Sequence, residues 1–355
     1  MTNKNLVMTA IDFKTPRQLP IWDNYWGKFS DNWREYMNFD KTVCPEDYYG
    51  ICISICVADE SLFPSQKKII KTEGEYEISN DGWGRIVRTG KNNIYFSETV
   101  DHILKNPSEL THFKPEPAAL DLRFDGFAEK VNREKKAGRC VFAKIGGLYC
   151  RSQFVRGEEN LLVDMALDEN FCNDLFDVML EHRIQMALET LHRGDLWDTG
   201  LFIYDDMANS KTVNFSPAMF ENYFLPRYKR LINEVKKAGC RHVFFHSDGN
   251  ILPVMEMLLE AGFTGFNPLE PSCGMELTGL RKQFGKRMVF FGGVCNKFIL
   301  PRGNKKEIEA HVRPLIELGR DGGLILGQAS IGDDINPEAY DYYISLIKEH
   351  GNYCN

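Results

Sequence analysis

Val243–Gly249 joins a short apolar strand to two side chains that can do chemistry. The heptapeptide reads Val-Phe-Phe-His-Ser-Asp-Gly, so three apolar residues lead into His246 and Asp248, and a glycine then turns the chain. Because alternate residues of a strand face the same side, the imidazole and the carboxylate are predicted to lie together. Such a pair can bind a metal ion or transfer a proton. The alternative is a buried histidine with satisfied hydrogen bonds, beside an acid that caps a helix.

Polar side chains also follow the other predicted strands at their carboxyl ends. In a parallel barrel these ends converge on one mouth, where ligands bind. Carboxylates with only a structural role would scatter over the helices, so their concentration at strand ends predicts a site at the mouth. The residues at these positions are Asp23, Asn24, Tyr204, Asp205, Asp206, His246, Asp248, Glu270, Cys273, Cys295 and Gln328.

Two kinds of chemistry fit these residue types. A zinc ion accepts nitrogen, oxygen and sulfur donors in tetrahedral geometry. A donor set of this kind is offered by His246, Asp248, Glu270 and Cys295. Without a metal, Asp205 and Asp206 would instead act with His246 as acid and base. The residue spacing by itself leaves both chemistries open.

The elements that position these residues alternate between strands and helices. Apolar strands are predicted at 19–22, 140–145, 201–204, 243–246, 263–266, 287–291 and 323–326. Helices follow them, and a spacing of about 30–40 residues fits an α/β fold of the (β/α)₈ TIM-barrel type. Turn residues divide the earlier segment 66–100 into short strands, which predicts an inserted antiparallel β-meander. Residues 1–355 are therefore expected to form a single barrel domain. The sequence has no GxGxxG and no P-loop motif, so neither dinucleotide binding nor P-loop nucleotide binding is indicated.

Composition argues against several classes of partner. The net charge is −7, and 43% of the residues are hydrophobic, as in ordinary globular proteins. Because there is no basic stripe, no nucleic-acid partner is expected. No run of about 18 apolar residues and no charged-then-apolar leader occurs, so neither a membrane span nor a secretory signal is predicted. The 10 cysteines form no CxxC pair, and we expect free thiols in a reducing cytoplasm.

Short motifs lie at the strand ends and helix starts of the predicted barrel. They are Leu19-Pro20-Ile21-Trp22, 154–162, Tyr204-Asp205-Asp206-Met207, Phe215-Ser216-Pro217, His246-Ser247-Asp248-Gly249, 267–271, 291–294 and 335–338. Together these motifs resemble the uroporphyrinogen decarboxylase superfamily over nearly the whole chain. The resemblance implies a (β/α)₈ barrel, in agreement with the alternation of strands and helices.

The superfamily has two main branches, and the mouth resembles one more than the other. The tetrapyrrole decarboxylases hold their substrate's carboxylates with arginines in an early loop, whereas the corresponding loop here, 23–27, contains no arginine. The corrinoid-dependent methyltransferases bind zinc through a His-x-Cys pair and a later cysteine, with a glutamate nearby. His246 matches the histidine, and Glu270 matches the glutamate. Asp248 and Gln328 stand where the two cysteines would be, so the set in this chain is richer in oxygen.

The resemblance implies a methyltransferase that moves a methyl group between a small methylated substrate and the cobalt of a separate corrinoid protein, with zinc assisting. No corrinoid-binding (cobalamin) module is recognised in the chain, so a corrinoid-binding partner protein would supply it. A homodimer is also compatible with the sequence. Two alternatives stay open: a metal-free decarboxylase or lyase acting on a less acidic substrate, and a non-catalytic barrel that binds a tetrapyrrole or corrinoid. The expected site residues are, for catalysis, Tyr204, Asp206 and His246, and, for substrate binding, Asp23, Asn24, Asp205 and Gln328.

Overall fold

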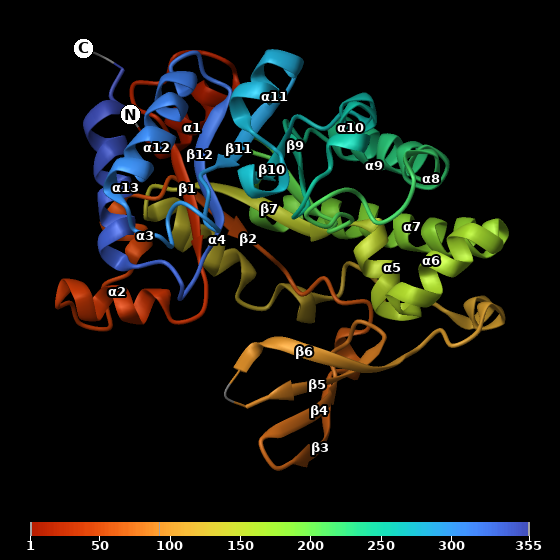
Figure 1. Ribbon diagram of the computed structural model, residues 1–355. Helices are drawn as coiled ribbons and strands as arrows, with labels where there is room; N and C mark the ends of the chain where they lie inside the picture. The colour runs from red at the N-terminus through yellow and green to blue at the C-terminus, as the bar shows by residue number, and fades with distance from the viewer. Residues whose placement is uncertain (1, 92, 354–355) are drawn as a thin grey trace.

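An eight-stranded parallel sheet dominates the computed structural model, which describes residues 2–91 and 93–353 (Figure 1). Its strand order is β1-β12-β11-β10-β9-β8-β7-β2, and every neighbouring pair is parallel. The strands are β1 (Ile21–Tyr25), β2 (Ile53–Cys56), β7 (Cys140–Gly146), β8 (Leu201–Tyr204), β9 (Val243–His246), β10 (Gly265–Leu269), β11 (Val289–Gly293) and β12 (Leu324–Ile331). The predicted TIM-type α/β fold is confirmed.

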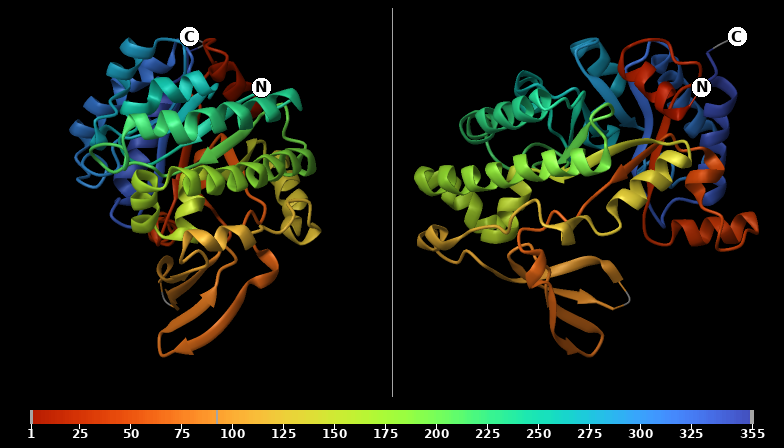
Figure 2. Two further views of the ribbon diagram at one scale, coloured as in Figure 1. Left: turned by 90° about the vertical axis from the view of Figure 1, so that its right-hand side faces the viewer. Right: turned by 180° about the vertical axis from the view of Figure 1, so that it is seen from behind.

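Helices connect these strands and surround the sheet (Figure 2). Helix α1 contacts β2, β7 and β12, and its Ala10 carbonyl accepts the N–H of Gly323 just before β12, so α1 covers the amino ends of the strands. The helices are α1 (Asn3–Ile11), α2 (Phe29–Met37), α3 (Pro45–Tyr49), α4 (Phe127–Lys136), α5 (Leu148–Arg156), α6 (Glu158–Leu167), α7 (Glu169–Gly194), α8 (Pro217–Met219), α9 (Leu225–Lys237), α10 (Met255–Ala261), α11 (Leu277–Phe284), α12 (Lys305–Gly319) and α13 (Pro337–His350). Within the described residues, no helix combines the length and the apolar character needed to cross a membrane.

Aromatic rings fill the interior of the barrel. Trp22 packs on Phe202 and Phe291, with ring centroids 5.4 and 5.9 Å away. Phe244 lies 4.9 Å from each of the same two phenylalanine rings, and Phe142 lies 5.5 Å from Phe202. Side chains alternate along a strand, so the residues two positions further along face the same interior, nearer the carboxyl ends. This next, polar layer includes Asn24, Lys144, Tyr204 and His246.

The two end strands of the sheet, β1 and β2, are joined at their amino ends. The N–H of Cys52 donates to the carbonyl of Ile21 at 2.9 Å. Beyond this bond, no ladder joins β1 to β2 in the described part of the chain, and β1 is irregular between Asp23 and Tyr25. A cavity of about 890 Å³ therefore extends from the barrel mouth, between these strands, to α4.

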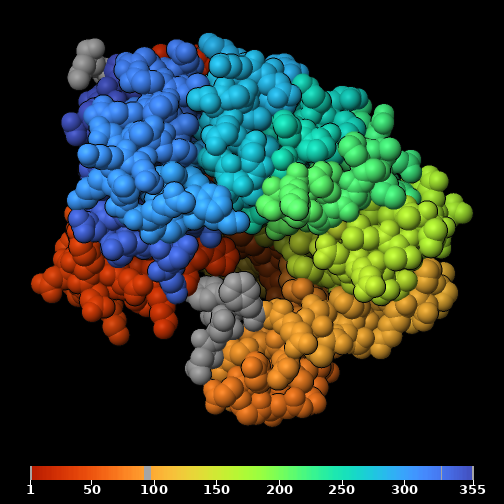
Figure 3. All heavy atoms as spheres, viewed as in Figure 1, coloured from red at the N-terminus to blue at the C-terminus, as the bar shows by residue number. Residues whose placement is uncertain are grey.

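The predicted β-meander is a separate four-stranded antiparallel sheet beside the mouth (Figures 1 and 2). The N–H of Ile103, just after this sheet, donates to the carbonyl of Gly84. Trp83 meets the Phe154 ring of α5 at 5.5 Å, and the Arg85 guanidinium lies 3.7 Å from the centre of that ring. The strands of this antiparallel sheet are β3 (Lys68–Glu73), β4 (Tyr76–Asn80), β5 (Arg85–Gly90) and β6 (Asn93–His102). Figure 3 shows the surface hollowed where this sheet meets the barrel. Asn92, which belongs to the predicted meander, lies outside the described residues.

The second barrel strand was not predicted from the sequence. β2 has only four residues, and its burial does not alternate in a simple way, because its ends are buried and its middle is half-buried. No helix follows it directly, since the chain continues toward the antiparallel sheet. A short strand without a helix after it lacks the strand–helix pattern on which the prediction of the other strands depended.

Candidate functional site

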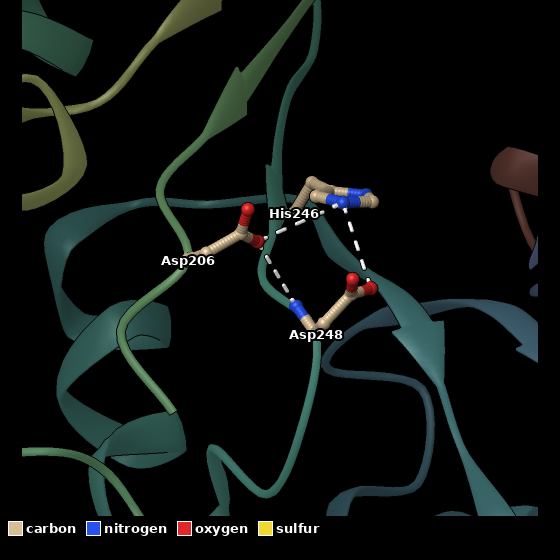
Figure 4. Close-up of side chains that lie close together, drawn as sticks. All are labelled: Asp206, His246 and Asp248. Atoms are coloured by element: carbon tan, nitrogen blue, oxygen red, sulfur yellow. Dashed lines mark hydrogen bonds and ion pairs between the residues drawn. The ribbon is translucent and has the colours of Figure 1, made fainter. Parts of the chain in front are cut away.

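Three side chains at the carboxyl ends of β8 and β9 face one another (Figure 4). The Nε2 atom of His246 lies 3.9 Å from Oδ1 of Asp206 and 3.8 Å from Oδ1 of Asp248. In the described part of the chain, this is the only group of three or more histidine, cysteine or acidic side chains whose ligand atoms all lie within 4.8 Å of one another. The imidazole is buried, whereas both carboxylates are exposed to the cavity. We call these three residues the triad.

The imidazole of His246 is held from two sides. Its Nδ1 atom lies 2.6 Å from the amide oxygen of Asn267, its register partner on β10. Because an amide oxygen only accepts, the Nδ1 atom donates its proton to Asn267, and Nε2 faces the two carboxylates. The ring of Tyr204 stacks on the imidazole with centroids 3.8 Å apart and planes at 6°. Burial raises the pKa of Tyr204, so this side chain is a neutral phenol.

A tight loop after β9 brings the second carboxylate back to the histidine. The N–H of Asp248 donates to Oδ1 of Asp206 at 3.1 Å, and the N–H of Gly249 donates to Glu270 at 2.9 Å. Gly249 has φ +86°, and a Cβ there would lie 2.5 Å from a backbone oxygen of Asn209, so the turn requires glycine. Burial raises the pKa of Asp248 to about 6; His246 lowers this pKa in part, and the charges of Asp206 and Glu270 raise it.

The triad fits a catalytic zinc ion. With bonds of about 2.0–2.1 Å, tetrahedral zinc sets its ligand atoms about 3.4 Å apart. The separations of 3.8 and 3.9 Å from Nε2 to the carboxylates are therefore slightly wide, and small side-chain rotations would close them. Three protein ligands leave a fourth position for substrate, and the hydrogen bond from Nδ1 supplies the orienting contact that histidine ligands usually have. One nitrogen and two oxygens also suit other first-row divalent metals.

The predicted four-residue zinc set is not assembled. Glu270 is held by the Gly249 N–H, and Cys273 lies 3.7 Å from the same carboxylate oxygen. The thiol of Cys295 is buried in the loop after β11 and accepts the N–H of Phe298 at 3.4 Å. His246 and Asp248 lie together as predicted, but the third member of the cluster is Asp206.

Asp205 lies under α5, away from the triad. Its carboxylate accepts the N–H groups of the first three residues of α5 at 3.0, 3.0 and 2.6 Å, and the hydroxyl of Tyr228 donates to it as well. Successive strand-end residues face opposite sides, so Asp206 reaches the cavity while Asp205 does not. Burial raises the pKa of Asp205 to about 6. The acid–base pair expected from Asp205 and Asp206 is therefore split between two environments.

Of the other residues predicted to bind substrate, only some have side chains that face the cavity. Asn24 is exposed and lines the cavity. Asp23 borders the cavity, but its buried carboxylate accepts the Gln328 N–H at 2.6 Å and the Tyr340 hydroxyl at 2.9 Å. Burial raises the pKa of Asp23 to about 7. The side chain of Gln328 donates to the carbonyl of Val294 at 2.9 Å. The carboxylate of Asp23 is thus directed toward β12 and α13.

Two residues of this region were not predicted from the sequence. Asn267 orients the histidine, and Lys144 lines the cavity from the middle of β7. A lysine inside the otherwise apolar strand Cys140–Gly146 is a signal that could have been used, because a charged residue rarely occupies a buried strand without a partner. Asn267 gave no such signal, since its role depends on strand pairing.

These features define a TIM-type barrel with a metal-capable triad at its mouth. The family model for uroporphyrinogen decarboxylase (URO-D) matches residues 150–350, more than half of the chain. The chain therefore belongs to the uroporphyrinogen decarboxylase family, which is a family of enzymes. No curated protein sequence matches it.

Comparison with solved structures supports the fold. A methyltransferase from Methanosarcina mazei superimposes with a TM-score of 0.69 at 15% identity, over 98% of this chain and 99% of that one. A Listeria monocytogenes protein described as a putative vitamin-B12-independent methionine synthase gives a TM-score of 0.40 at 14% identity, over 94% and 96% of the two chains. At 15% identity, the match to the Methanosarcina mazei protein shows a shared fold alone.

Proposed function

We propose that this enzyme transfers a methyl group between a small methylated substrate and the cobalt of a separate corrinoid protein, with zinc bound by Asp206, His246 and Asp248. The observation that carries the proposal is the triad itself, with Nε2 of His246 held toward two carboxylates. Family membership, the resemblance of the mouth to the methyltransferase branch and the methyltransferase fold of a solved structure support it.

Different residues of the site have different roles in the proposed reaction. Zinc, when bound, would polarise the heteroatom that carries the methyl group and so make it a better leaving group. Asn267 fixes the tautomer of His246, and Tyr204 fixes the plane of its ring. The aromatic layer below, which includes Phe202, closes the floor and excludes water from the reacting atoms. A cavity of about 890 Å³ lies within the range of small-ligand sites.

The metal-free alternative has less support. It requires Asp205 and Asp206 to act as a pair, but Asp205 is fully buried and engaged by four donors. The loop 23–27 offers no arginine for a substrate with many carboxylates. Methyl transfer therefore accounts for more of the arrangement than decarboxylation does.

A direct assay tests the proposal. Zinc-loaded enzyme is mixed with cob(I)alamin, as a surrogate for the corrinoid protein, and a panel of methylated ethers, amines, alcohols and acids. The expected result is methylation of the cobalt by at least one donor, followed spectroscopically, and its loss in His246→Ala. Release of carbon dioxide from a carboxylic acid by chelator-treated enzyme, without cobalt methylation, would overturn the proposal in favour of a lyase.

A further inference from the structure

Two buried arginines and a half-buried lysine surround a single buried carboxylate beside the triad. Lys144 and Arg151 both donate to Oε1 of Glu60, Arg151 at 3.0 Å, and Arg183 lies 3.1 Å from Oε2. Burial raises the pKa of Glu60, but the charges of the three cations outweigh burial and bring that pKa below its usual value. Glu60 is therefore ionised, and positive charge is in excess around it.

No second acid of the described residues forms an ion pair with these three cations. The ion pairs of Lys144, Arg151 and Arg183 are all with Glu60. The Nε atoms of both arginines are buried and have no hydrogen-bond partner in the described structure. The charge of Asp205 also acts on Arg151, but in the described structure the two side chains form no ion pair. Uncompensated buried charge is costly, so an anionic ligand would be bound favourably here.

Lys144 is the member of the cluster that reaches the cavity. It lines the cavity together with Tyr204, Asp206 and His246. Its ammonium lies 5.2 Å from the centre of the Tyr204 ring, which stacks at 3.8 Å on His246. The distance from the Lys144 ammonium to the centre of the imidazole ring is therefore no greater than the sum of these two separations. That span suits the two ends of one small molecule.

Lys144 is more than a partner for Glu60. The two arginines alone would neutralise that carboxylate, and the N–H of Gly146 also donates to it. An ammonium has three donors, and in the described structure one hydrogen bond of Lys144 is present, to Glu60. Two donors are thus left for a ligand in the cavity.

We propose that the substrate carries a carboxylate that binds the ammonium of Lys144 while its methyl-bearing end lies at the triad. The proposal rests on the proposed function, because it names the substrate class of the same site. Arg151 and Arg183 do not touch the substrate; they hold Glu60 and add positive potential. The specificity therefore depends on one lysine, in contrast to the early-loop arginines that this chain lacks.

A binding comparison tests this without any turnover. Dissociation constants of methoxyacetate and its neutral amide, methoxyacetamide, are measured by ligand-observed NMR on zinc-free protein. Without metal, Asp206 and Asp248 repel an anion, so a preference for the acid cannot come from the triad. Because a charge-assisted hydrogen bond is worth about 1.5–3 kcal/mol, the acid is expected to bind at least about tenfold more tightly. The same comparison is made in two lysine variants.

Lys144→Met is expected to reduce the preference to below about threefold. Lys130→Met is the matched control, since Lys130 is an exposed lysine at the outer part of the same cavity, and it should keep the full preference. Equal binding of acid and amide by the wild type, or a preference that survives Lys144→Met, would overturn the proposal. The comparison of acid and amide binding to the wild type needs no variant, so it still tests the proposal if Lys144→Met does not fold. A failure of methyl transfer would overturn the proposed function and leave this preference intact, so the two failures are distinguishable.

Discussion

The phenol ring of Tyr204 lies flat against the imidazole of His246, at 3.8 Å between centroids and 6° between planes. Asn267 holds the same imidazole through Nδ1 at 2.6 Å. A ring fixed by both a stacking partner and a hydrogen bond has one orientation, and its Nε2 atom then points at Asp206 and Asp248. The site is therefore organised without a metal, which would favour tight binding of the proposed zinc ion.

Loss of the stacking ring should weaken the metal site without unfolding the protein. Tyr204→Leu keeps an apolar side chain at the mouth but lets the imidazole turn, so we expect roughly a tenfold loss of zinc affinity. Tyr204→Phe keeps the stacked ring and should bind zinc as the wild type does. Competition with a chromophoric chelator measures both variants. Equal affinities in Tyr204→Leu and Tyr204→Phe would show that stacking does not position the ring.

The hydrogen bond from Asn267 should matter in a different way. Asn267→Leu removes the acceptor for Nδ1, so the proton can move to Nε2 and block the lone pair, and zinc affinity should fall by about 10–100-fold. Asn267→Asp keeps an acceptor of similar shape and should retain most of the affinity. Proton NMR of the imidazole N–H reports the tautomer directly. An Nδ1–H signal that persists in Asn267→Leu would contradict the assignment.

Most of the fold could be predicted from the sequence because its strands carry a simple pattern. Strands such as β8 and β9 are apolar, short and followed by helices, and their predicted bounds, 201–204 and 243–246, agree with the structure. β2 was not predicted because no α-helix follows it directly in the sequence. The predicted bounds of β10 and β11 begin about two residues too early, because an apolar residue, Phe263 or Met288, lies just before each strand.

Asp23 should make stability depend on pH. Its folded-state pKa is about 7, above the usual 3.8, because burial disfavours the charged carboxylate. The unfolded chain therefore releases this proton first, and the contribution of Asp23 is present below about pH 4 and is lost as pH rises through about 7. The loss is at most about 4 kcal/mol. The amide of the Asp23→Asn variant does not ionise, so the free energy of unfolding of this variant relative to wild type should rise between about pH 5 and about pH 8, as measured by urea titration. A pH-independent difference would refute this role of Asp23.

Asp205 is predicted to support structure, and Asp206 to bind metal. Asp205→Ala leaves three buried N–H groups of α5 and the Tyr228 hydroxyl without an acceptor, so unfolding free energy should fall by about 2–4 kcal/mol. Asp206→Ala, at an exposed position, should change it by about 0.5 kcal/mol or less and yet weaken zinc binding. Denaturant unfolding and zinc competition on both variants separate the two roles. The reverse pattern would mean that the roles of these neighbours are exchanged.

The site was less predictable than the fold because local sequence does not fix which way a side chain points after a strand ends. Asp205 and Asp206 are equivalent by sequence, but α5 takes one and the cavity receives the other. Glu270 and Cys295 lie at the expected strand ends, yet Glu270 accepts the N–H of Gly249 from the loop after β9, and Cys295 accepts the N–H of Phe298 within its own loop. Lys144 in β7 could have been singled out as a charged residue in an apolar strand. The excess positive charge around it depends on Glu60, Arg151 and Arg183, and the sequence alone does not show that these side chains meet.

The triad is tested most directly by zinc stoichiometry. Wild type, His246→Ala, Asp248→Ala and the exposed control Lys130→Met are loaded with zinc, desalted and analysed for metal and protein. We expect one zinc per chain in the wild type and in Lys130→Met, and loss of that zinc in His246→Ala and Asp248→Ala. A wild type that retains no metal, or a His246→Ala variant that keeps a full equivalent, would contradict the account.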